Sequence, residues 1–167
     1  MFRQENALSR DKFPVTSAIR MLRENRVDFV EHPYKYEEGG GTEVAAEELG
    51  VDEHLVIKTL VMEDDQKAPF IILMHGDKQV STKELARAMG VKSVHSCDPQ
   101  VAFRHTGYIV GGISPFGTKK KLRVHVEETI LSLPRIFINA GRKGLLFEMS
   151  PADLTKILQP TPVHVAR

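Results

Sequence analysis

A stretch rich in glycine and proline, Gly107–Gly117, limits the possible folds of this chain more than any other segment. A short apolar strand is expected at 108–110, and it runs directly into the paired glycines at 111 and 112. Pro115 then interrupts any helix or strand, so no regular element is expected before Leu122. The sequence therefore predicts a structured loop here, around which the other elements have to be arranged.

The same loop has the composition of a ligand-binding segment. Adjacent glycines let a ligand approach the main chain closely and offer backbone N–H groups as donors. Ser114 adds a hydroxyl, and Lys119, Lys120 and Lys121 add positive charge after the loop. These features suit an anionic or carbonyl-bearing ligand, but paired glycines also occur in ordinary turns and lysine runs in ordinary solvated edges. The spacing matches neither G-x-x-x-x-G-K-[ST] nor G-x-G-x-x-G, so the usual nucleotide loops are not indicated.

Apolar patterning and capping residues predict the other elements. The helices start after the caps Thr16, Thr42, Ser81, Asp98 and Ser150, and Pro160 is expected to end regular structure. Because strands and helices alternate irregularly, and 56–75 read as a hairpin, a mixed sheet carrying several helices is expected. The expected strands are 29–32, 56–62, 70–74, 91–94, 108–110, 122–126, 136–138 and 145–148.

Length and charge restrict the function classes. The 167 residues, of which 41% are hydrophobic, fit a single domain at 15–160 behind a flexible segment at 1–14. Lys plus Arg number 23 against 22 Asp plus Glu, which excludes a protein that coats nucleic acid nonspecifically. Cys97 is the single cysteine, and no apolar run has the length of a membrane span. The expected location is therefore the cytoplasm, with no membrane partner.

Lys58 is the anomaly of the predicted hairpin. It lies in the middle of the apolar run 56–62, and strand alternation places it on the same face as Val56 and Leu60. An ammonium group is costly there unless it reaches water, a partner or a ligand. Two interpretations remain open: a lysine that reaches water near a sheet edge, and a lysine that lines a cleft.

Several kinds of catalytic chemistry are not indicated. The seven histidines show no close metal-ligand spacing, so neither a metal nor another cofactor is expected. Ser114 is followed by a proline and does not fit the G-x-S-x-G elbow. Cys97 precedes a predicted helix, but cysteine in such a place is more often simply buried. What remains is a site of loop amides, Lys58 and hydroxyl groups, which can bind a carbonyl and stabilise negative charge on it.

Several separated motifs together resemble one family. They are GYIVGGISPFGTKK at 107–120, VIKTLV at 56–61 and INAGRKGL at 138–145, and in this order they resemble the YbaK/EbsC family of aminoacyl-tRNA deacylases. The resemblance implies an α+β fold, with a mixed, mainly antiparallel, barrel-like sheet surrounded by helices. It also implies a trans-editing hydrolase that removes a wrong amino acid from tRNA, typically cysteine or alanine from tRNA(Pro), with prolyl-tRNA synthetase as a possible helper.

The resemblance also implies roles for individual residues. The family lysine falls on Lys58, and the family's glycine-rich loop falls on Gly111–Pro115, with Gly112 at the position associated with activity. Further substrate-binding positions are Tyr34, Thr59, Gly111, Ile113, Ser114, Pro115, Asn139 and Gly141, and tRNA phosphates are expected at Lys119, Lys120, Lys121, Arg142 and Lys143.

Two positions depart from the family members that act on cysteinyl-tRNA. Asn139 stands where those members commonly have serine, and Leu146 stands where they have aspartate. Cysteine is the first expected amino acid, and alanine or another small residue is the next. The alternative function is a non-catalytic module of the same fold that only holds an aminoacyl or nucleotide-like ligand or tRNA.

Overall fold

The predicted hairpin is the centre of the fold. In the computed structural model, which describes residues 14–167, β2 (Val56–Asp64) pairs with β3 (Pro69–His75) in antiparallel register, Ile57 opposite His75. Strand β3 is buried from Phe70 to His75, because its two faces pack into different apolar clusters. The flexible segment predicted at 1–14 lies, except for residue 14, outside the described residues.

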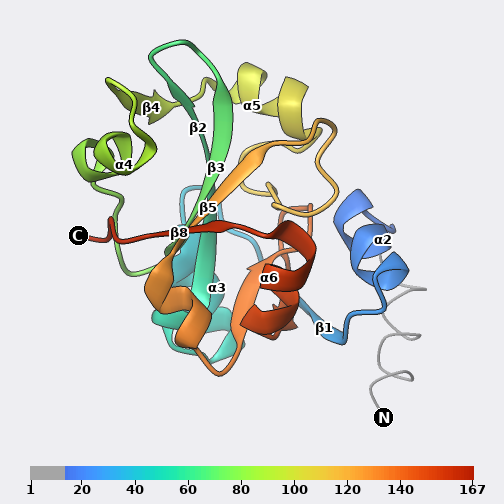
Figure 1. The fold of residues 1–167 in the computed structure, drawn as a ribbon. Helices are drawn as coiled ribbons and strands as arrows, with labels where there is room; N and C mark the ends of the chain where they lie inside the picture. The colour runs from blue at the N-terminus through green and yellow to red at the C-terminus, as the bar shows by residue number, and fades with distance from the viewer. Residues whose placement is uncertain (1–13) are drawn as a thin grey trace.

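The hairpin belongs to a mixed sheet whose strand order is β1-β7-β6-β2-β3-β5-β8, with β4 added to β2 (Figure 1). The pairs β2–β6, β3–β5 and β5–β8 are parallel, and the other four pairs are antiparallel. This confirms the expected mixed, mainly antiparallel α+β architecture. The remaining strands are β1 (Phe29–Pro33), β4 (Val94–Ser96), β5 (Arg123–Glu127), β6 (Ile136–Asn139), β7 (Leu145–Met149) and β8 (Thr161–Val163).

The helices surround the sheet, and local capping explains most of their ends. The side chains of Thr16, Ser81 and Ser150 each accept a backbone N–H from the first turn of the helix that follows. Gly50 and Gly90 end two helices in the left-handed conformation, which glycine adopts at little cost. The helices are α2 (Ser17–Glu24), α3 (Gly41–Leu49), α4 (Thr82–Met89), α5 (Pro99–Thr106) and α6 (Pro151–Leu158), with short 3-10 turns η1 (Glu53–Leu55) and η2 (Glu128–Ser132).

The structure corrects four of the expected elements. No strand forms at 108–110, where the Tyr108 side chain turns inward while Ile109 and Val110 remain exposed. Thr42 lies inside α3 rather than capping it, because its hydroxyl instead donates to Glu53 Oε2. The short strand expected at 91–94 is found at β4, and regular structure continues past Pro160 into β8, which pairs with β5.

Three apolar clusters fix the positions of the elements. The largest joins α2 and α6 to one face of the sheet, and a second joins α4 to the other face. The third packs Ala45 and Ala46 of α3 against Val56, Phe137 and Leu146. Within the described residues, no helix has the length and apolar character needed to cross a membrane.

Candidate active site

A cavity of about 520 Å³ opens beside β2, at a gap in the sheet. Strand β3 follows one side of β2 along 57–63, but on the other side β6 reaches only Val56 and Ile57, and β4 only 62–64. Within the described part of the chain, the β2 edge between these contacts therefore has no strand beside it. The cavity is lined by Val56–Val61, so this gap is part of its wall.

Thr59 presents both its main chain and its side chain to the cavity region. On this edge the Val61 carbonyl accepts a hydrogen bond from the Cys97 N–H. In a strand, the N–H and C=O groups of every second residue point to the same side, and Thr59 is two residues before Val61. The Thr59 main chain consequently faces the gap. Its hydroxyl is buried and has no hydrogen-bond partner among residues 14–167. A buried hydroxyl without a partner is costly, which favours a ligand group that bonds to it.

Lys58 lines the same cavity from the neighbouring position of β2. Its Nζ donates a hydrogen bond to the Lys78 carbonyl. Burial lowers the pKa of this lysine, while the negative charges of Glu53 and Asp77 act in the opposite direction. Lys58 is half-buried and lines the cavity. Of the two interpretations that the sequence left open, this position agrees with the lysine that lines a cleft.

The glycine-rich loop and the turn after β6 are connected by Asn139. Its Oδ1 accepts the N–H groups of Gly141 at 2.7 Å and Arg142 at 3.2 Å, and its Nδ2 donates to the Gly111 carbonyl at 3.2 Å. Asn139, Gly111 and Ile113 all line the cavity, together with Tyr34. The structure thus brings six predicted site residues into one place: Tyr34, Lys58, Thr59, Gly111, Ile113 and Asn139.

Four predicted residues lie behind the cavity wall. A Cβ on Gly112 would come within 2.9 Å of the Arg142 carbonyl carbon and the Lys143 nitrogen, so this glycine lets two loops touch. The Gly112 N–H is used in a turn, where it donates to Ile109. Ser114 and Pro115 are buried, and Gly141 packs against the Tyr108 ring. These positions give the four residues a supporting role in the loops.

The predicted tRNA-contacting residues divide into two groups. Lys119, Lys120 and Lys121 are exposed, and the first two are tied by their main-chain N–H groups to the end of α5. Lys143 instead forms an ion pair with Glu38 at 2.7 Å, with its Nζ 5.2 Å from the Tyr36 ring centre. The hydrogen bond and the charge of Glu38 raise the pKa of Lys143. Arg142 is half-buried beside it.

Sequence reasoning did not place Tyr36 or Cys97 in the cavity wall. Tyr36 lies against the loop, since a Cβ on Gly111 would come within 2.5 Å of its hydroxyl. Cys97 also lines the cavity, and burial, followed by the nearby Glu63 carboxylate, raises the pKa of its thiol to about 11. The thiol is therefore protonated near neutral pH and is a poor nucleophile there. Neither residue has a sequence motif that marks it.

One wall of the cavity is apolar. Ala45, Val56 and Leu146 line it and belong to the cluster beneath α3, and Tyr34 packs against that cluster. Leu146 is only 4% exposed. It stands where family members that act on cysteinyl-tRNA have an aspartate, so the wall carries no side-chain charge at this position. Burial raises the pKa of Tyr34, which keeps its hydroxyl protonated. The cavity thus combines an apolar wall with polar groups from β2 and the loops.

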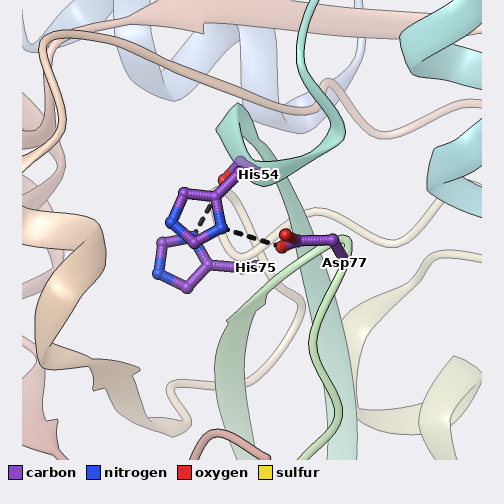
Figure 2. Close-up of side chains that lie close together, drawn as sticks. All are labelled: His54, His75 and Asp77. Carbon is purple, nitrogen blue, oxygen red and sulfur yellow. Dashed lines mark hydrogen bonds and ion pairs between the residues drawn. The ribbon is translucent and has the colours of Figure 1, made fainter.

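Near Lys58, the fold also gathers His54, His75 and Asp77, which the sequence did not reveal as a group (Figure 2). Their possible ligand atoms lie within 4.8 Å of one another. The two imidazole rings are stacked 3.7 Å apart at 6°, so their in-plane lone pairs lie in two separate, nearly parallel planes and do not converge on one ion. Both His75 nitrogens are hydrogen-bonded to protein groups. The arrangement is that of a hydrogen-bonded chain, and the absence of a metal stays a prediction.

Comparisons with known proteins identify the family of the chain. Residues 37–157 match the model of the aminoacyl-tRNA editing domain family. The chain is 31% identical over 143 residues to EbsC of Enterococcus faecalis, which is named as a Cys-tRNA(Pro)/Cys-tRNA(Cys) deacylase, and the match covers 85% of this chain and 87% of EbsC.

Two further comparisons are with a proline–tRNA ligase and with a solved structure of the same fold. A proline–tRNA ligase of Lactobacillus helveticus is 28% identical over 112 residues, which are 66% of this chain and 20% of the ligase. A crystal structure described as a trans-editing enzyme for prolyl-tRNA synthetase has the same fold, with a TM-score of 0.79 at 20% identity over 93% of this chain and 99% of that one. From the family match and the identity to EbsC, the chain belongs to the aminoacyl-tRNA editing domain family, the YbaK/EbsC type of aminoacyl-tRNA deacylase.

Proposed function

We propose that this protein is a trans-editing enzyme that hydrolyses the ester of mischarged aminoacyl-tRNA, with cysteinyl-tRNA(Pro) as the first substrate and alanyl-tRNA(Pro) as the next. The name of EbsC supports cysteine, and the ligase relatives support tRNA(Pro). The proposed place of action is the cytoplasm. Because the net charge is only +1, we propose that prolyl-tRNA synthetase assists tRNA recognition.

The observation that carries this proposal is the set of residues that line the cavity. One space of about 520 Å³ is lined by Lys58, by Thr59, whose buried hydroxyl has no hydrogen-bond partner among residues 14–167, and by the loop residues Gly111 and Ile113, next to an apolar wall. An aminoacyl ester offers the matching parts: a carbonyl oxygen that becomes negative during attack, ribose hydroxyls and a side chain. Such an ester is already activated and requires positioning and charge stabilisation more than a strong protein nucleophile.

We assign the residues roles that their positions support. Lys58 stabilises the negative charge that develops on the ester oxygens, and Thr59 and the loop hold the acyl group. Ser114 is fully buried with its hydroxyl bonded to the Phe116 N–H, and the Cys97 thiol is protonated, so neither is suited to attack. Water attacks the carbonyl carbon, the carbon–oxygen bond to the ribose breaks, and the ribose oxygen takes a proton. With cysteinyl-tRNA, the substrate's own thiol can attack instead: a carbon–sulfur bond forms, the bond to the ribose breaks with the thiol proton passing to the ribose oxygen, and water then opens the resulting cyclic thioester.

The test is deacylation of a panel of mischarged tRNAs by the wild type and by Lys58→Ala. Loss of one preorganised charge at such a site typically reduces the rate about 10²- to 10³-fold, and we expect that loss for cysteinyl-tRNA(Pro). The matched control is Lys156→Ala, an exposed lysine of α6, which should retain full activity. Tight binding of the same tRNAs without hydrolysis by the wild type would contradict the proposal and establish the alternative, a non-catalytic binding module.

A further inference from the structure

The histidine pair near Lys58 is held in one arrangement by its surroundings. His75 is 1% exposed, its Nδ1 lies 2.8 Å from the His54 carbonyl, and its Nε2 lies 2.7 Å from Thr129 Oγ1. A carbonyl only accepts hydrogen bonds, so Nδ1 carries a proton and Nε2 can accept from the Thr129 hydroxyl. Burial, in the first place, lowers the pKa of His75, which agrees with a neutral ring. His75 is therefore a fixed, flat surface on which the His54 ring stacks.

The stacked His54 ring in turn holds Asp77. Its Nδ1 lies 2.8 Å from Asp77 Oδ1, the contact drawn as a dashed line in Figure 2. Burial raises the pKa of Asp77, but the hydrogen bond and charge of His54 outweigh this effect and leave the pKa below its ordinary value. Asp77 is thus a carboxylate with a fixed position at neutral pH.

Asp77 lies in the short segment that holds Lys58. The Gly76 N–H donates to the Val56 carbonyl at 2.7 Å, and the next carbonyl after Asp77, that of Lys78, accepts the Lys58 ammonium. A Cβ at Gly76 would lie 2.6 Å from Thr42 Oγ1 and 2.8 Å from the Val56 oxygen, so this segment packs tightly against α3 and β2. Two carboxylates, Glu53 and Asp77, act on the Lys58 charge.

We propose that Asp77 and His54 are positioning residues for Lys58: their hydrogen-bonded contact fixes residues 76–78, so that the Lys78 carbonyl holds the Lys58 ammonium and the Asp77 carboxylate acts on its charge. The inference deepens the proposed function, since it assigns to the deacylation site a supporting pair outside the cavity lining. The charged or titratable groups that face this pair are Lys58, Glu53 and His75, with Glu127 acting on His75 from β5.

The test combines a substrate-free titration with kinetics. The pKa of Lys58 is measured by NMR of the lysine Cε signals in the full-length protein, and the Lys58 signal is assigned by comparison with Lys58→Arg. In Asp77→Asn the ammonium loses a nearby negative charge, so its pKa should fall. The alkaline limb of the kcat/KM profile for cysteinyl-tRNA(Pro), corrected for spontaneous hydrolysis, should move to lower pH, with kcat/KM reduced on the order of tenfold.

His54 provides a matched pair of variants. In His54→Asn the amide nitrogen can replace Nδ1 as the donor to Asp77, so the Lys58 titration and the rate should stay near those of the wild type. His54→Leu loses the donor and should reproduce the reduced rate of Asp77→Asn. The control is His32→Leu, which removes a histidine–carboxylate contact of the same length, 2.8 Å to Glu148, and should change neither readout.

The outcomes separate this inference from the proposed function. An unchanged Lys58 pKa in Asp77→Asn overturns the inference, whatever happens to the rate, because a purely structural role would lower stability without moving that titration. A lowered Lys58 pKa in a protein that hydrolyses none of the esters upholds the positioning pair and refutes the deacylase proposal. Thermal unfolding of each variant identifies any that fail to fold, and Asp77→Ala, which removes the same negative charge, then takes the place of Asp77→Asn.

Discussion

Gly111 and Gly112 are adjacent in the sequence but are required for different reasons. Gly111 has a φ of +93°, a conformation that other residues rarely adopt, and it lies against the Tyr36 hydroxyl. Gly112 has no such φ, and its requirement is purely steric, since the backbone of Arg142 and Lys143 occupies the space of a side chain. The residue that the family resemblance connects with activity therefore acts on the shape of the cavity through the contact between two loops.

We predict that Gly112→Ala separates the glycine-rich loop from the turn at 139–144. The new methyl group would meet backbone atoms that cannot rotate away, and such overpacking typically costs about 1–3 kcal/mol of folding stability. Urea denaturation measures this loss. Because Gly111, Ile113 and Asn139 would shift with the loops, deacylation should fall as well.

The control for this variant is Gly90→Ala at the end of α4. Gly90 has a φ of +71° and nothing near its missing Cβ, so alanine there costs about 1–2 kcal/mol through backbone strain alone. Activity should be retained in that variant. If both variants lose stability equally and both keep full activity, Gly112 does not shape the cavity.

At the scale of elements, local signals were predictable and long-range contacts were not. The caps Thr16, Ser81 and Ser150 were identified correctly because each bonds within its own first turn. The strand expected at 108–110 was wrong because Tyr108 instead donates its hydroxyl to the Phe116 carbonyl at 2.6 Å and fills the core. The pattern of apolar residues does not reveal such a choice, which depends on what the loop folds against.

The same distinction explains which site residues the sequence revealed. Lys58 was recognisable because a charge interrupts an apolar strand, and the glycine-rich loop because of its composition. Asp77 and His54 carry no local signal, since they meet only through the register that pairs Ile57 with His75. The place of Asn139 as the link between two loops likewise depends on the packing of β6 beside the glycine-rich loop.

Asn139 offers a test of that link. Asn139→Ala removes acceptors for two N–H groups and the donor to the Gly111 carbonyl, which we expect to cost about 1–2 kcal/mol at this half-exposed position. Asn139→Asp retains the acceptor for the two N–H groups, loses the donor and adds a negative charge near the Gly111 carbonyl. Thermal unfolding should show that Asn139→Ala is less stable than Asn139→Asp. Equal stability of the wild type and both variants would show that the Asn139 hydrogen bonds do not stabilise the turn.

At the scale of the whole molecule, the near-zero net charge requires that any tRNA contact be local. Lys119, Lys120 and Lys121 are exposed beside the end of α5, whereas Lys143 is already paired with Glu38. Exposed lysines can replace the counterions of phosphates, and a lysine with a carboxylate partner must first give up that partner. The lysine run is therefore the better candidate for phosphate contacts.

We predict that replacing all three lysines by glutamine reduces the slope of log K against log salt for tRNA binding by roughly 2–3. Lys143→Gln should change that slope little. Binding titrations at several salt concentrations measure both values. A control that changes three exposed lysines elsewhere, Lys67, Lys83 and Lys156, should leave the slope unaltered, and an equal reduction in that control would mean that general charge, not this site, attracts the tRNA.

The gap between β6 and β4 also sets a length. Four residues of β2, Lys58–Val61, lie between the two neighbouring strands, which corresponds to about 13 Å at a rise of about 3.3 Å per residue. An extended group that bonds to this edge would contact β6 at one end and β4 at the other. The sheet therefore limits the length of the acyl group that can bind along this edge. We therefore predict that a single aminoacyl group fits the gap whereas a long peptide attached to tRNA does not, so that the protein should leave peptidyl-tRNA intact in a deacylation assay.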